Sequence, residues 1–123
     1  MNGYYLKNYD AAIADRTKVI EFERSPGKQD WVGAGDLASS YESRARFYLG
    51  KQAYPEAIAD LDTAIALYPQ SDSLYWFRAR VKFDAGDMRG AIADASRVLE
   101  MVGPNSILVE VVRKLIDDAK SKL

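Results

Sequence analysis

The chain of 123 residues contains neither cysteine nor histidine. Without cysteine there can be no disulfide, no thiolate zinc site and no cysteine nucleophile. Without histidine there can be no metal site or catalytic triad that depends on imidazole, the usual acid–base group near neutral pH. Carboxylate or lysine catalysis is left as a formal possibility, but pairs such as Asp117 and Asp118 are explained as helix surface. We therefore expect a protein that is not an enzyme, with no catalytic residue, metal or cofactor.

Long apolar stretches and an excess of one charge are also missing. The chain has 17 Lys and Arg against 18 Asp and Glu, a formal net charge of −1, which gives no general attraction to nucleic acid or anionic membranes. No apolar run approaches the roughly 18 residues of a membrane span. Residues 1–7 lack the basic and apolar regions of a signal peptide. These absences favour the cytoplasm.

What the sequence does contain is a repeated tetrapeptide. Ala-Ile-Ala-Asp occurs at 12–15, 57–60 and 91–94. The spacing of the last two copies matches the length of about 34 residues that is typical of a helix–turn–helix repeat. Such units bury their apolar faces only against their neighbours, and their stacked surfaces are typically used for binding.

Two full units follow from this alignment, a second repeat at 38–71 and a third at 72–104. In each we expect an aromatic-rich opening helix followed by an alanine-rich closing helix. Pro55 suits the first turn of a closing helix, and Asp87 suits the residue that caps one. The expected packing residues are Tyr41, Ala45, Tyr48, Ala57, Ile58, Leu61, Ala64 and Ile65 in the second repeat, and Tyr75, Ala79, Phe83, Ala91, Ile92, Ala95, Val98 and Leu99 in the third.

The first repeat, at 1–24, is partial. Its closing helix is expected at about Tyr9–Glu23, and the residues before it are too few for a full opening helix. Tyr4–Leu6 could supply only a short half-helix. We therefore expect a residual apolar patch that serves homodimerisation or contact with an upstream repeat. Its residues are Ala12, Ile13, Val19 and Ile20.

An inserted loop at 25–37 explains why the first two tetrapeptides, which begin at Ala12 and Ala57, lie further apart than one period. Gly and Pro residues mark the segment as a loop. Within it, Trp31 and Val32 are expected to pack against a neighbouring helix.

Residues 105–123 form a further amphipathic helix, capped by Asn105 or Ser106. A final repeat needs a cap with a polar outer face, and this helix suits that role. The polar face carries both charge signs and no aromatic anchor, which disfavours a membrane-surface helix. The expected apolar stripe is Leu108, Val111, Val112, Leu115, Ile116 and Ala119.

The repeats resemble the tetratricopeptide repeat family. The second repeat carries the family's spaced pattern, and the third carries it with Lys82 in place of the second aromatic residue. The resemblance implies an all-α solenoid, a superhelix of helix–turn–helix repeats with a C-terminal capping helix. The matching residues are Tyr41, Ala45, Tyr48, Ala57, Leu61, Ala64 and Pro69, and then Tyr75, Ala79, Ala91, Ala95 and Val98.

An arginine precedes the aspartate of each full repeat at the same spacing, as Arg44 with Asp60 and Arg78 with Asp94. These pairs could form a repeated anion site or a structural bridge between the two helices of a unit. The bridge is favoured, because a single unpaired charge at a helix contact would be costly and the planar fork of arginine fits a carboxylate. Loss of Arg78 is then expected to leave Asp94 without its partner.

The resemblance also implies a concave groove lined by the opening helices. Arg46 and Arg80 lie one period apart and should project from equivalent positions, where they could bind a partly apolar peptide with a carboxylate. Alternatively, each arginine pairs with an acidic residue of its own helix. One family subgroup clamps chaperone C-termini, but only Arg80 matches its five clamp residues. The groove candidates are Glu42, Arg46, Leu49, Trp76, Arg80, Phe83 and Asp84.

Three functions agree with these features. The leading hypothesis is a non-enzymatic scaffold that binds a protein or peptide in the groove, as a complete protein or as a piece of a larger one. The second is a self-association module that forms a homodimer through the incomplete first repeat. The third is a regulatory segment beside an enzyme or transport domain.

Overall fold

The computed structural model describes residues 3–27 and 33–123, with side chains from Asn8 onward. These residues form helices and no strands. The chain divides into two compact units, Met1–Pro69 and Gln70–Leu123. The expectation of an all-α protein is confirmed. Trp31 and Val32 lie outside the described residues.

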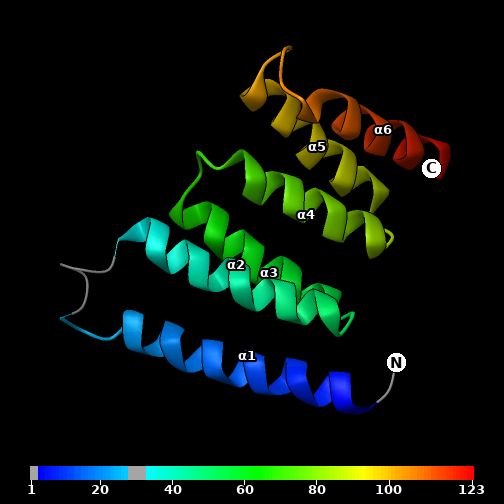
Figure 1. Ribbon diagram of the computed structural model, residues 1–123. Coiled ribbons are helices and arrows are strands. Elements are labelled where there is room, and N and C mark those ends of the chain that lie inside the picture. The colour runs from blue at the N-terminus through cyan, green and yellow to red at the C-terminus, as the bar shows by residue number, and fades with distance from the viewer. Residues whose placement is uncertain (1–2, 28–32) are drawn as a thin grey trace. The chain divides into compact units, whose positions relative to one another are not determined.

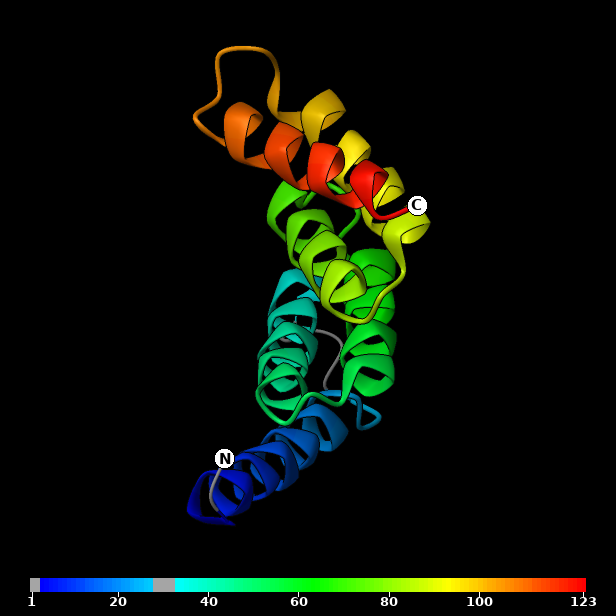
Figure 2. The ribbon, with the colours of Figure 1, turned by 90° about the vertical axis from the view of Figure 1, so that its right-hand side faces the viewer.

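The first unit contains α1 (Gly3–Glu23), α2 (Ala34–Gly50) and α3 (Tyr54–Leu67). The three helices follow one another in space as they do in sequence, and α2 packs against both α1 and α3 (Figures 1 and 2). The α2–α3 contact is built around small side chains that let two helices approach closely. Its completely buried residues are Ala45, Ala57, Leu61 and Ala64.

Local chemistry sets the ends of α2 and α3. At the start of α2 the amide of Gly33 donates to Asp36 Oδ2 at 3.4 Å, and the helix begins at Ala34, ahead of the expected start of the second repeat at residue 38. The connection to α3 turns at Gln52, whose φ of 62° lies in the left-handed region. Pro55 occupies the first turn of α3, as expected.

The first helix is longer than the sequence predicted. It runs without a break from Gly3 to Glu23, so the backbone of Tyr4–Leu6 extends the closing helix and does not form a separate half-helix. No proline or glycine follows Gly3 to interrupt the helix. Polar contacts join it to α2: Ser40 Oγ donates to Glu23 Oε1 at 2.6 Å, Arg24 Nη1 to Tyr41 Oη at 2.5 Å, and Lys51 pairs with Asp10.

The second unit contains α4 (Asp72–Asp84), α5 (Met88–Val102) and α6 (Leu108–Ser121). Side chains cap the starts of α4 and α5, and at α6 a serine two residues before the first helical residue accepts from its amide. The amide of Leu74 donates to Ser71 Oγ at 3.3 Å, that of Gly90 to the carboxylate of Asp87 at 2.9 Å, and that of Leu108 to Ser106 Oγ at 3.1 Å. The prediction that Asp87 caps α5 is confirmed, whereas the N-cap residue of α6 is Ile107 and neither Asn105 nor Ser106.

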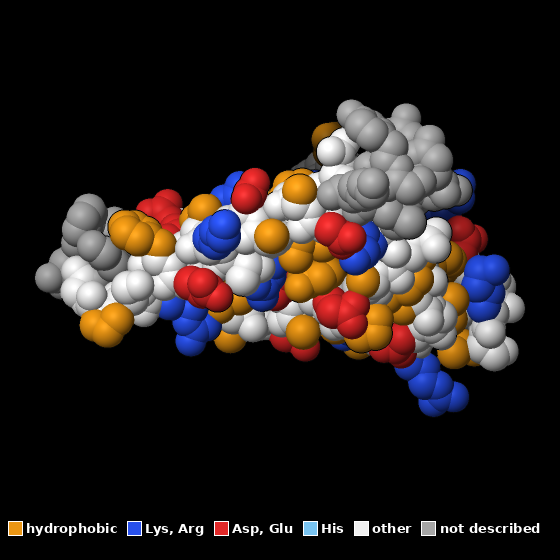
Figure 3. Space-filling view, turned by 90° about the horizontal axis from the view of Figure 1, so that it is seen from below, with side chains coloured by type: hydrophobic (Ala, Val, Ile, Leu, Met, Phe, Trp, Pro, Cys, Tyr) orange, Lys and Arg blue, Asp and Glu red, His pale blue; other side chains and the backbone are white. Residues whose placement is uncertain are grey.

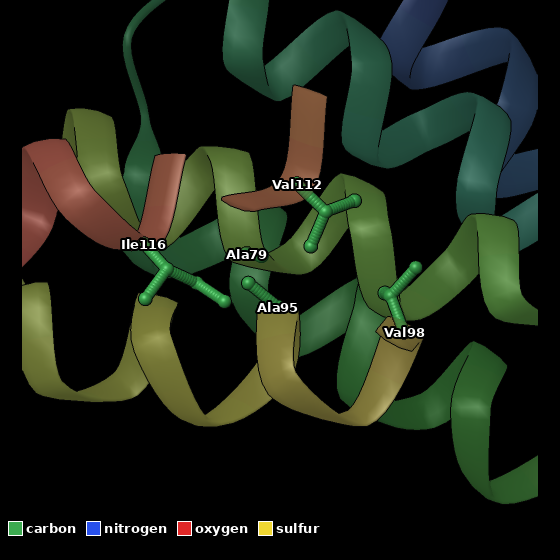
Figure 4. Close-up of a cluster of buried hydrophobic side chains, with 5 residues drawn as sticks. All are labelled: Ala79, Ala95, Val98, Val112 and Ile116. Atoms are coloured by element: carbon green, nitrogen blue, oxygen red, sulfur yellow. The ribbon is translucent and has the colours of Figure 1, made fainter. Parts of the chain in front are cut away.

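The core of the second unit lies where its three helices meet. Val112 and Ile116 of α6 face Ala95 and Val98 of α5 and Ala79 of α4 (Figure 4). Val98 and Val112 are completely buried, whereas the small side chains of Ala79 and Ala95 leave room for them. The last helix therefore covers the apolar face of α5.

One residue of the expected α6 stripe faces outward. Val111 is 53% exposed, whereas its neighbour Val112 is completely buried. The two side chains point about 100° apart around the helix, and only one direction faces α5. The prediction that Val111 belongs to the packing stripe is wrong. Among the described residues, no helix is both long and apolar enough to cross a membrane.

Candidate functional site

The groove candidates fall on both units. Glu42, Arg46 and Leu49 belong to α2 in the first unit, and Trp76, Arg80, Phe83 and Asp84 belong to α4 in the second.

On α2, Arg46 is held by its own helix. Its Nη2 donates to Glu42 Oε2 at 3.0 Å, one turn earlier, while 65% of its side chain is exposed. Leu49 is half-buried. The alternative expected from the sequence, a surface arginine paired with Glu42, is the arrangement that the structure contains. An exposed pair of this kind contributes only a few tenths of a kcal/mol, about 0.3–0.5, to stability.

On α4, the candidates line an open hollow of about 220 Å³ between α4 and α6. Its α4 side consists of Trp76, Arg80 and Phe83, which recur at helical spacing on one face. Asp84 is exposed and does not line it. The α6 side consists of Val111, Lys114, Leu115 and Asp118.

The floor of this α4–α6 hollow is held in place by the core. Trp76 and Leu115 are half-buried and pack against the cluster of Ala79, Val98 and its neighbours. Phe83 and the outward-facing Val111 extend the apolar surface. An apolar floor with few polar groups at its edge is the usual composition of a binding site.

Charged groups stand at the edge of the same hollow. Arg80 comes from α4, and Lys114 and Asp118 come from α6, one helical turn apart. Arg80 is exposed and makes no hydrogen bond or ion pair with any residue that the structure describes. Two cations face one anion, so the hollow favours a ligand with a carboxylate and an apolar group.

The contribution of α6 to the α4–α6 hollow was not predicted from the sequence. Lys114 and Asp118 were expected on a solvated face and Val111 in the packing stripe, because the last helix was interpreted only as a cap. The expected stripe of α6 was wider than a single contact with α5 requires. That width was the one signal in the sequence that α6 borders a second surface.

The Arg44–Asp60 pair joins α2 to α3 with two hydrogen bonds. Arg44 Nε lies 2.8 Å from Asp60 Oδ2, and Arg44 Nη2 lies 2.6 Å from Asp60 Oδ1. The hydrogen bonds to Asp60 raise the pKa of Arg44 above its ordinary value. Arg44 Nη1 also donates to Thr17 Oγ1 of α1 at 3.1 Å, so one guanidinium links all three helices.

The Arg78–Asp94 pair joins α4 to α5 in the same way, with Nε–Oδ2 and Nη2–Oδ1 distances of 2.7 Å. Lys82 is the second cation here, and its Nζ lies 3.1 Å from Asp94 Oδ2. The predicted Arg78–Asp94 bridge is present, and loss of Arg78 would still leave Lys82 beside Asp94. Lys82 stands where the second repeat has Tyr48, one period earlier.

No group of three or more acidic residues within the described part of the chain is arranged to hold a metal ion. Comparison with models of known protein families and with curated proteins gives no match for this chain.

Proposed function

We propose that the protein is a non-enzymatic scaffold of the tetratricopeptide type that binds a peptide or a segment of another protein. Support for the repeat type comes from the spacing of the last two tetrapeptides, which matches one repeat of about 34 residues, and from helices that pack in sequence order within each unit. A protein without cysteine or histidine has few means of catalysis, which agrees with a binding role.

The α4–α6 hollow is the observation that carries this proposal. Trp76 and Phe83 provide a rigid aromatic surface, and Arg80 and Lys114 approach it from two helices. A peptide that presents a Leu or Phe beside an Asp, a Glu or its own C-terminal carboxylate would satisfy both features. The hollow is small and open, so the expected affinity is micromolar.

Selection from a random peptide library, followed by titration of the selected peptides with Trp fluorescence as the readout, tests this function. In the matched pair of double variants, Arg80→Ala/Lys114→Ala removes the two cations of the hollow. Arg113→Ala/Lys120→Ala removes two exposed cations of α6 that do not line it. Both variants change the net charge equally.

The first variant should weaken binding of the selected peptides at least about tenfold, and the second should leave it within about twofold. Equal loss in both would mean that binding follows net charge alone. Selected peptides that lack both acidic groups and large apolar residues would also contradict the proposal.

A further inference from the structure

Side chains on the outer face of α1 are more exposed than their equivalents in the two full repeats. The tetrapeptide alignment places Asp15 at the position of Asp60 and Asp94, which are only 4% and 5% exposed. Asp15 itself is exposed, and Val19 is 39% exposed. The residues equivalent to Ala12 and Val19 are completely buried: Ala57, Ala64, Ala91 and Val98.

Asp15 and Val19 line an open hollow of about 220 Å³ in the first unit. Its residues are Ala12, Asp15, Arg16 and Val19 of α1, together with Phe47 of α2. Figure 3 views the molecule from the side on which α1 lies, and that face shows hydrophobic side chains among charges of both signs.

In the second unit, a helix occupies the place that is equivalent to this hollow. There α5 is the closing helix and α6 the helix after it, as α1 and α2 are in the first unit. In the second unit α4 packs against α5 and also touches α6. The α1–α2 hollow therefore corresponds to the place of α4.

The charge at this hollow points to the residue that a helix bound there should carry. Asp60 and Asp94 each accept two hydrogen bonds from an arginine, whereas Asp15 makes none and has no ion pair with any residue of the described part. A carboxylate beside an apolar surface is a favourable site for the planar fork of an arginine.

The two helices that fill the equivalent places share a short motif. It reads Tyr-Glu-Ser-Arg-Ala at 41–45 and Tyr-Trp-Phe-Arg-Ala at 75–79. In both, the guanidinium carbon lies 5.5 Å from the centre of the tyrosine ring, and the alanine is completely buried against the closing helix. The tyrosine holds the arginine, and the alanine sets the close approach.

We infer that the α1–α2 hollow is a second binding site, which takes an amphipathic helix of another protein with the motif Tyr-x-x-Arg-Ala. The arginine pairs with Asp15, and the alanine lies against Ala12 and Val19. Arg16 stands where the full repeats have Leu61 and Ala95, so the partner helix carries an acidic residue opposite it. This site is separate from the α4–α6 hollow and does not depend on the function proposed for it.

A labelled peptide with the sequence of residues 34–51, which contains the motif, is the probe. Fluorescence anisotropy against the full chain should give saturable binding with a micromolar Kd. Asp15→Asn in the protein, or replacement of the motif arginine by glutamine in the peptide, should each weaken binding at least about tenfold. The two changes combined should cost no more than either alone. Asp84→Asn, an exposed carboxylate of α4, is the control and should have no effect.

An isolated helix of this length is only partly formed in water, so a second experiment supplies the helix covalently. Residues 34–53 are joined directly to Tyr9 in place of residues 1–8, which copies the connection between α2 and α3. The added helix should raise the urea midpoint of unfolding, and Asp15→Asn should remove most of the increase.

The inference would be overturned if the peptide did not bind and the added helix did not raise the urea midpoint. Binding or stabilisation that is equally strong with Asn at position 15 would also overturn it, because the recognition would not involve Asp15. Sedimentation at rising protein concentration tests whether a second copy of this chain occupies the hollow. A dimer of the unmodified chain that Asp15→Asn dissociates would place a second copy in the hollow and would exclude a separate partner there.

Discussion

Lys82 Nζ lies 3.1 Å from Asp94 Oδ2, so the carboxylate that binds Arg78 has a second cation, which comes from the same helix as Arg78. The equivalent position beside Asp60 is occupied by Tyr48, whose ring centre lies 5.8 Å from the guanidinium carbon of Arg44. The two repeats therefore use the same arginine–aspartate bridge with different support. In one, Tyr48 is a second aromatic ring near the arginine, in addition to Tyr41. In the other, a lysine shares the carboxylate.

Removal of the two arginines should therefore have unequal effects. Arg44→Ala leaves Asp60 buried without a cation and should lower the free energy of unfolding by about 2–3 kcal/mol. Arg78→Ala leaves Lys82 beside Asp94 and should cost about 1 kcal/mol. Urea denaturation of the two variants measures the difference.

The matched control is Lys82→Met, which keeps the length of the side chain. In that background Arg78→Ala should become as costly as Arg44→Ala, because Asp94 then has no cation on α4. Equal losses from the two arginine variants while Lys82 is present would mean that the lysine does not support Asp94.

The pH dependence of the Arg44–Asp60 pair follows from the raised pKa of Arg44, whose main cause is the hydrogen bonding to Asp60. A folded-state pKa above the unfolded value stabilises the fold at every pH below the unfolded pKa, and the contribution disappears only as pH rises through the folded value. The stability difference between the native chain and Arg44→Gln should therefore stay constant from neutral pH to about pH 10. Urea unfolding in a series of buffers measures this difference. A difference that shrinks within this pH range would contradict the attribution of the stabilisation to the charge of Arg44.

Much of the fold could be predicted because small residues recur in the sequence at the helix contacts. Ala45, Ala57, Ala79 and Ala91 recur at fixed spacing where two helices must approach closely, and all four are completely buried. The length of α1 could not be predicted from the same pattern. No Pro or Gly lies between Gly3 and Glu23 to interrupt the helix, and the expectation of a half repeat there rested on the period and on the few residues before Tyr9.

The candidate site was only partly predictable. The spacing of Trp76, Arg80 and Phe83 marked one face of α4, and these three residues line the α4–α6 hollow. The opposite wall depends on how α6 is rotated about its axis. A stripe that contains both Val111 and Val112 allows more than one rotation, and packing against α5 selects the one that buries Val112.

The contact between Tyr9 of α1 and Gly50 of α2 should be sensitive to a single methyl group. A Cβ at Gly50 would overlap the Tyr9 ring, whereas a Cβ at Gly35, near the start of the same helix, would approach Tyr68 only to an ordinary 3.9 Å. Gly50→Ala should therefore destabilise α1 against α2 by about 1–3 kcal/mol. Gly35→Ala should be neutral or stabilise by up to about 1 kcal/mol. Hydrogen exchange of the α1 amides measures the effect locally, and unchanged protection in Gly50→Ala would mean that Tyr9 does not pack on Gly50.

Val111 and Val112 are adjacent, and the same substitution at each should separate packing from binding. Val112→Ala removes two methyl groups from a completely buried side chain and should cost about 1.5–3 kcal/mol, the lost transfer free energy together with that of the cavity. Val111→Ala changes a side chain that is 53% exposed and should alter stability by less than about 0.5 kcal/mol. Because Val111 lines the α4–α6 hollow, its replacement should nevertheless weaken peptides selected for that hollow by a few-fold. Thermal unfolding and peptide titration of the two variants give the four values. A Val111→Ala variant that loses as much stability as Val112→Ala would show that α6 is rotated to bury both valines, and the α4–α6 hollow would then lose one of its walls.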